Sequence, residues 1–185
     1  MIRDFKPALL FLSKFLGIYV LGNIAYGIYI NQYYPQSDPT TQWVSNQVSA
    51  ILSYSGTSVT AIPSSSKATI SLTEEFTGDT IINIFEGCNG INVEIVFLAF
   101  LVAYQGTIKR TIIFSLMGTL VIHVFNLARI ILLFHQAKNH SPYFYYVHKY
   151  LFTAILYVVV MVLWWLWVSK FNGIKNDHSG QAQVE

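Results

Sequence analysis

The chain has 185 residues, of which 54% are hydrophobic, 16% aromatic and only 11% charged. This composition is far more apolar than that of a soluble domain and indicates an integral membrane protein. The formal net charge of +2, carried by scattered basic residues that form no basic stripe, argues against nucleic acid as a partner.

Four apolar stretches predict transmembrane helices, since a hydrocarbon core about 30 Å thick needs roughly 20 apolar residues per helix. They cover residues 8–30, 90–104, 111–134 and 150–168. The second stretch is short, but residues 81–85 before it are also apolar, and Tyr104 suits the headgroup layer. The first is expected to be a retained helix, because its apolar run is too long for a signal peptide and lacks a small-residue cleavage site.

The basic residues near the helix ends predict the orientation, because positively charged short loops stay in the cytoplasm. They lie before the first span, between the second and third, and after the fourth: Arg3 and Lys6, Lys109 and Arg110, Lys170 and Lys175. Both termini are therefore expected inside, and residues 31–89 and 135–149 outside. We expect one integral-membrane domain over residues 1–171 and a disordered cytoplasmic tail over residues 172–185.

The long outer insert, residues 31–89, has patterns of its own. Apolar residues recur at helical spacing over residues 41–54 and predict an amphipathic helix that lies on the membrane surface and roofs a site. Residues 59–62, 68–72 and 80–85 are β-branched stretches separated by turn residues. They predict a small antiparallel sheet.

The only cysteine, Cys88, lies in the run Glu86-Gly87-Cys88-Asn89-Gly90 just before the second predicted span. An unpaired thiol on an oxidising outer side needs either burial or a use. One interpretation is a buried cysteine that acts as a small hydrophobe. The flanking glycines instead let backbone N–H groups approach a ligand, and the N-terminus of the following helix favours a thiolate. That arrangement suits a nucleophile.

Asn126 and Arg129 lie three residues apart on one face of the third predicted span. An arginine at the centre of a transmembrane helix costs about 2.5–3.5 kcal/mol, so Arg129 is expected to face a polar cavity. The alternative is that it snorkels to the outer headgroups. His123, one turn deeper, is expected to be a structural core histidine.

His148 lies where the chain re-enters the membrane from outside, a position that is also typical of an interfacial histidine. The loop charges place Cys88, Arg129 and His148 at the same outer depth, where they are able to meet. A cysteine and a histidine in contact share a proton to give the thiolate that acyl transfer needs. An arginine beside them would stabilise the oxyanion of a tetrahedral intermediate or orient the substrate carbonyl.

These motifs resemble those of the exosortases and archaeosortases, membrane-embedded cysteine transpeptidases with a Cys, Arg and His constellation on separate helices. The resemblance covers most of the chain in order and spacing. Residues 86–91 resemble the cysteine motif, residues 126–130 the arginine motif, and His148 with Phe152-Thr153-Ala154 the histidine motif. Many relatives carry a glycine soon after the histidine, where this chain has Ala154. The short chain is most similar to the compact subgroup called exosortase F.

By this resemblance, Cys88 would attack a peptide bond in the carboxy-terminal, membrane-spanning sorting signal of an exported protein. His148 would act as acid and base, and Arg129 would stabilise the intermediate. The acyl-enzyme would pass to an amine on a lipid or glycan acceptor, or to water. Four neighbours are expected to support the site or bind substrate: Glu86, Asn89, Gly90 and Asn126. The resemblance implies no cofactor or metal, and a place in the bacterial cytoplasmic membrane with the site facing outward.

Other classes of function fit the sequence less well. A thiol-disulfide enzyme needs at least two cysteines. A metal site built from His135, His140 and His148 has no pair at the i, i+3 or i, i+4 spacing of helical ligands. The main alternative is a non-catalytic four-helix scaffold or assembly partner for surface polysaccharide or secretion machinery, which predicts that Cys88 is replaceable.

Overall fold

The computed structural model describes residues 2–104, 106–139 and 152–171, and these are mostly helical. The helices outside the insert are α1 (Ile2–Asn31), α3 (Ile91–Ala103), α4 (Ile108–Lys138) and α6 (Phe152–Leu166), which continues into the π-helical turn η3 (Trp167–Phe171). Between α1 and α3 the chain forms α2 (Pro39–Tyr54), the strands β1 (Val59–Pro63), β2 (Thr69–Glu74) and β3 (Thr80–Phe85), and the 3-10 turn η1 (Glu86–Cys88).

Two of the described helices are long and apolar enough to cross a membrane: Phe5–Asn31 of α1 and the whole of α4. The helix α3 has 13 residues and so measures only about 20 Å. Ala154–Lys170 at the end of the chain is likewise a shorter apolar helix. The other two predicted spans therefore correspond to helices below full spanning length, and the start of the fourth lies outside the described residues.

Aliphatic side chains are exposed along α1 from Leu9 to Ile28. Leu9, Leu21 and Ile28 are 55%, 67% and 60% exposed, and none of the apolar window of this helix is buried. Exposed apolar surface of this extent is typical of contact with lipid rather than water. The helix therefore supports the prediction of a membrane protein.

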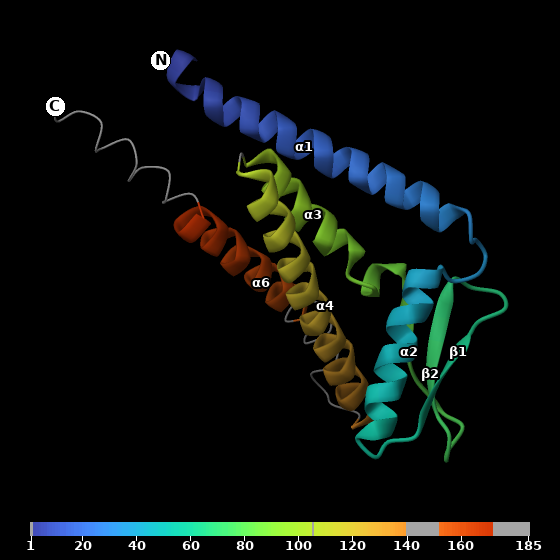
Figure 1. Ribbon diagram of the computed structural model, residues 1–185. Helices are drawn as coiled ribbons and strands as arrows, with labels where there is room; N and C mark the ends of the chain where they lie inside the picture. The colour runs from blue at the N-terminus through green and yellow to red at the C-terminus, as the bar shows by residue number, and fades with distance from the viewer. Residues whose placement is uncertain (1, 105, 140–151, 172–185) are drawn as a thin grey trace.

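The helix α3 packs against α1, α4 and α6, and α4 packs against α6 (Figure 1). Near the start of α1, the Phe11 ring lies 5.5 Å from Phe100 and 6.0 Å from Tyr104 at the end of α3. Phe114, in the second turn of α4, lies 5.0 Å from Trp167, which follows α6. The start of α1, the end of α3, the start of α4 and the end of α6 thus meet at one end of the bundle. Four basic residues belong to these helix ends: Lys6, Lys109, Arg110 and Lys170.

The insert forms a compact layer at the other end of the bundle. The strands pair as an antiparallel sheet in the order β1-β2-β3, and α2 covers it (Figure 1). Asp38 caps α2, since its Oδ1 accepts a hydrogen bond from the Thr41 N–H at 3.0 Å. The predicted helix and three strands are confirmed, with ends that shift by one or two residues.

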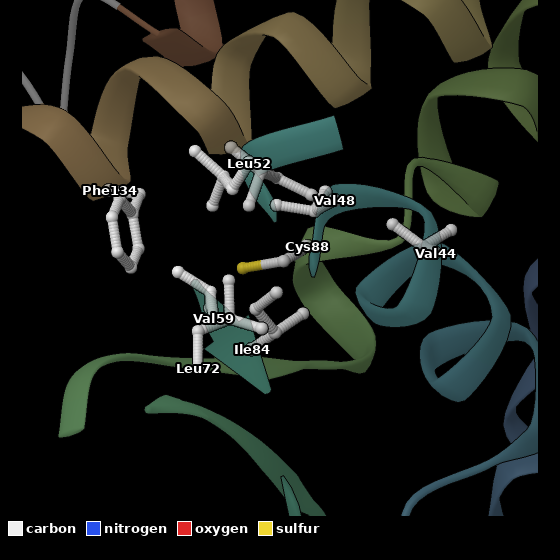
Figure 2. Packing of buried hydrophobic residues seen from close by; sticks show 9 residues of the cluster. Val44, Val48, Leu52, Val59, Leu72, Ile84, Cys88 and Phe134 are labelled. Carbon is white, nitrogen blue, oxygen red and sulfur yellow. The ribbon is translucent and has the colours of Figure 1, made fainter. Parts of the chain in front are cut away.

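The apolar face of α2 lies against protein, not on the membrane surface as the sequence predicted. Val44, Val48 and Leu52 are fully buried and pack with residues of the sheet, with Cys88, and with Ile130 and Phe134 of α4. The sheet and α4 together bury the stripe that a lone helix would turn to lipid. The helix still lies directly against the cysteine, as Figure 2 shows.

Candidate active site

The turn that carries Cys88 joins the sheet to α3. It begins where β3 ends at Phe85 and closes at Gly90, whose φ of 90° lies in the left-handed region. A Cβ at Gly90 would also come within 3.2 Å of the Asn126 side chain. Glycine is therefore required here both by the backbone conformation and by the close approach of α4. The sequence predicted a close approach at this glycine, but to a ligand.

Asn89 fixes the turn from two sides. Its Nδ2 donates to the Tyr26 hydroxyl of α1 at 2.7 Å and to Thr41 Oγ1 of α2 at 3.1 Å. Its Oδ1 accepts from the Ile91 N–H at 3.1 Å, at the start of α3. Thr41 in turn donates to Asp38 Oδ2 at 2.5 Å. These residues form a polar network in which Asp38, Thr41 and Asn89 are each at most 3% exposed, so the turn is held rigidly.

Asn126 connects Cys88 to Arg129. Its Nδ2 donates to the Cys88 carbonyl oxygen at 2.9 Å, and its Oδ1 accepts from Arg129 Nη1 at 3.4 Å. The two motifs that the sequence placed at one depth therefore meet through a fully buried amide. Within the described part of the chain, the Nε of Arg129 is buried and has no hydrogen-bond partner. A buried N–H without an acceptor costs about 1–3 kcal/mol. A hydrogen-bond acceptor placed beside this Nε–H would remove that cost.

The Cys88 side chain is 5% exposed and lies among aliphatic residues (Figure 2). Burial raises the pKa of the thiol above its ordinary value, although the nearby Arg129 guanidinium and a backbone hydrogen bond at Phe85 lower it. Burial in this environment therefore opposes formation of the thiolate. This differs from the sequence-based expectation of a thiolate stabilised by glycines and a helix N-terminus, because α2, the sheet and α4 close around the sulfur.

A cavity of about 270 Å³ adjoins the thiol. It lies between β3 and the C-terminal part of α4, and five of its seven lining residues are isoleucine or leucine. The residues that line it are Cys88, Ile81, Ile82, Asn83, Ile84, Ile130 and Leu133. The thiol thus has apolar free space beside it despite its low exposure.

The remaining predicted site residues are placed as follows. Glu86 contributes its main-chain carbonyl, which accepts from the Tyr26 hydroxyl at 3.3 Å. His148, the predicted acid and base, lies outside the described residues, as does His140 of the alternative metal site. Among the described residues no group of three or more His, Cys, Asp or Glu side chains suits a metal.

His123 binds α2 rather than the cysteine, as expected of a structural histidine. Its Nε2 lies 2.9 Å from Gln47 Oε1, and its ring stacks on Trp43 with centroids 4.7 Å apart. This contact joins the insert to α4 one turn below Asn126.

Sequence reasoning missed Tyr26, Asp38 and Thr41 as residues that position the turn. Asp38 and Thr41 carried a local signal, since the run Ser37-Asp38-Pro39 before a helical pattern is typical of a helix N-cap. Tyr26 carried none, because it contacts Asn89 from 63 positions away in the chain.

Comparison with known proteins gives one family. The family model described as transmembrane exosortase matches residues 6–166. No curated protein and no solved structure matches the chain. The matched range contains the cysteine turn, the Asn126–Arg129 pair and His148, and extends over most of the sequence. The chain therefore belongs to the transmembrane exosortase family.

Proposed function

We propose that the chain is a membrane transpeptidase that cleaves the carboxy-terminal sorting signal of exported proteins through an acyl-enzyme on Cys88. The observation that carries this proposal is the link from Cys88 through Asn126 to Arg129, whose Nε has no acceptor among the described residues. Family membership supports the same chemistry.

In the first step, the Cys88 sulfur attacks a peptide carbonyl carbon, and a C–S bond forms as the carbonyl oxygen takes the negative charge. The Arg129 guanidinium stabilises that oxyanion with its Nε–H, which has no acceptor among the described residues. The intermediate then collapses, the C–N bond breaks, and a thioester to Cys88 remains. Asn126 is a positioning residue in this scheme, because it acts through the backbone of the cysteine and through the arginine.

Burial raises the pKa of the Cys88 thiol, so this thiol must lose its proton to a base before it attacks. We assign this role to His148, which then returns the proton to the leaving amine. An amine of a lipid or glycan acceptor, or water, resolves the thioester. The proposal includes four membrane spans with both termini inside, the site on the outer side of the bacterial cytoplasmic membrane, and membership of the compact exosortase F subgroup.

One observation favours the alternative of a non-catalytic scaffold, namely the packing of Cys88 in an aliphatic core. The two functions differ in what happens when the thiol is removed. A scaffold tolerates Cys88→Ala, whereas a transpeptidase loses all turnover.

The test is a proteomic comparison of cells whose own copy of the gene encodes wild type, Cys88→Ala or Val124→Ala. Val124 is 54% exposed on α4 and serves as the matched control. We expect a set of exported proteins to retain an apolar carboxy-terminal segment in the Cys88→Ala cells alone. Identical carboxy termini in all three strains, with equal amounts of the three proteins in the membrane, would refute the proposal.

A further inference from the structure

The strand that leads to Cys88 has a free edge. In the described part of the sheet, β3 pairs only with β2, so on its other side alternate residues present unpaired backbone N–H and C=O groups. Such an edge is a template for an added strand. The chain passes from Phe85 at the end of β3 directly into the turn that holds Cys88. A strand added to β3 would therefore run toward the nucleophile.

A bulge in β3 aims two neighbouring isoleucines at the cavity. Leu72 pairs with Ile82 and Thr73 with Thr80, so Ile81 has no opposite residue in β2. Both Ile81 and Ile82 consequently line the cavity, although neighbours in a regular strand point to opposite faces.

Asn83 also lines the cavity, although its side chain bonds Ser71 on the other face, with Ser71 Oγ donating to Asn83 Oδ1 at 2.7 Å. The cavity therefore reaches the main chain at the edge of the strand. Ile130 and Leu133 of α4 close the opposite wall. The strand β3, the cavity and the thiol are thus adjacent.

From this arrangement we propose that β3 and the cavity form the subsite for the acyl part of the substrate. An extended peptide pairs with the free edge of β3, and the apolar side chain just before the scissile bond fills the cavity. This inference rests on the proposed function. The part of the substrate before the scissile bond is the part that binds to β3. The part after that bond stays in the membrane in the proposed substrate, whereas β3 belongs to the insert that we propose lies outside.

The chemistry of the cavity limits what it holds. Five of its seven lining residues are isoleucine or leucine, so a charged side chain would lose hydration against most of the wall. Its volume of about 270 Å³ lies below the roughly 300–1,000 Å³ of typical ligand pockets. One large apolar side chain suits that space. The unpaired main-chain groups of the β3 edge suit the backbone of the peptide that carries this side chain.

The experiment measures alkylation of Cys88 in the detergent-solubilised full chain by tripeptide chloromethyl ketones. The thiolate displaces chloride, so each event forms one C–S bond and breaks one C–Cl bond, which mass spectrometry detects. The reagents are acetyl-Ala-Ala-Leu and acetyl-Ala-Ala-Asp chloromethyl ketone, and the leucine reagent with N-methylated alanines. Iodoacetamide, which has no peptide, reports the reactivity of the thiol itself.

We expect the leucine reagent to react at least about tenfold faster than the aspartate reagent, and N-methylation to slow it by a similar factor. Ile81→Trp, which narrows the cavity, should reduce the preference for leucine, measured as the ratio of the leucine to the aspartate rate within the same variant. Ile62→Trp is the matched control, because Ile62 is 49% exposed on β1, at the other edge of the sheet. It should keep the preference.

The outcomes separate the two proposals. Equal rates with all three peptides, together with an iodoacetamide reaction that depends on His148, would overturn the subsite and leave the proposed function standing. Slow iodoacetamide labelling that is the same with and without His148 would overturn the proposed function and the subsite together.

Discussion

Removal of the Asn126 side chain should destabilise the protein measurably, because the amide joins the turn to α4. Asn126→Ala deletes the donor to the Cys88 carbonyl at 2.9 Å and the acceptor of Arg129 Nη1 at 3.4 Å. The position is fully buried, so the carbonyl loses a donor that water does not replace. An unsatisfied buried group costs about 1–3 kcal/mol. For a chain of about this length, each kcal/mol lowers Tm by about 2–4 °C, which gives a fall of about 2–12 °C.

Thermal unfolding of the full chain in detergent, followed by circular dichroism, measures this effect. Asn126→Asp should lower Tm by a similar amount, since a carboxylate still accepts from Arg129 but does not donate to the Cys88 carbonyl. Val124→Ala, at an exposed position on the same helix, should leave Tm within about 1–2 °C. A Tm of Asn126→Ala equal to that of Val124→Ala would refute the idea that this amide holds the turn.

Three further substitutions test the environment of the turn by the same melting assay. Gly90→Ala should lower Tm more than Gly56→Ala does. Both glycines have a positive φ near 90°, but only at Gly90 would the new Cβ lie against a side chain. Equal losses of stability would mean that backbone strain of about 1–2 kcal/mol is the whole effect. Tyr26→Phe removes the acceptor of Asn89 Nδ2 at 2.7 Å and should cost about 0.5–1.5 kcal/mol, and an unchanged Tm would mean that α1 does not anchor the turn. Lys138→Ala breaks a partly exposed ion pair, in which Lys138 Nζ lies 2.9 Å from Glu74 Oε1 of β2. The free energy of unfolding should fall by less than about 1 kcal/mol. A larger fall would show that the pair is more than a surface contact.

The insert between α1 and α3 was predictable because its signals are local. The stripe of Val44, Val48 and Leu52 has helical period, and the β-branched strands are bounded by turn residues. What the stripe faces was not predictable from the helix alone, since a lipid surface and a protein core demand the same pattern. The structure shows that the stripe faces the sheet and α4.

The candidate site was predictable only in part. Loop charges placed Cys88 and Arg129 at one depth, and the structure joins them through Asn126. The contacts of Asn89 with Tyr26 and Thr41 span 63 and 48 positions, and no local pattern reports such separations. The bulge at Ile81 depends on register between two strands, so the cavity beside the thiol also had no signal in the sequence.

The measurement that tests the central claim most directly is the rate of Cys88 alkylation by iodoacetamide from pH 5 to 9 in wild type, His148→Ala and Arg129→Ala. Burial raises the pKa of the thiol, so without His148 the thiolate fraction should be small at pH 7 and should rise about tenfold per pH unit while the pH stays below that pKa. Arg129→Ala should be slower than wild type, because the guanidinium lowers the pKa of Cys88. An activated nucleophile predicts rapid wild-type labelling well below pH 8.5 that His148→Ala abolishes. Slow labelling of all three proteins across the range would contradict it and leave Cys88 as an inert part of the core.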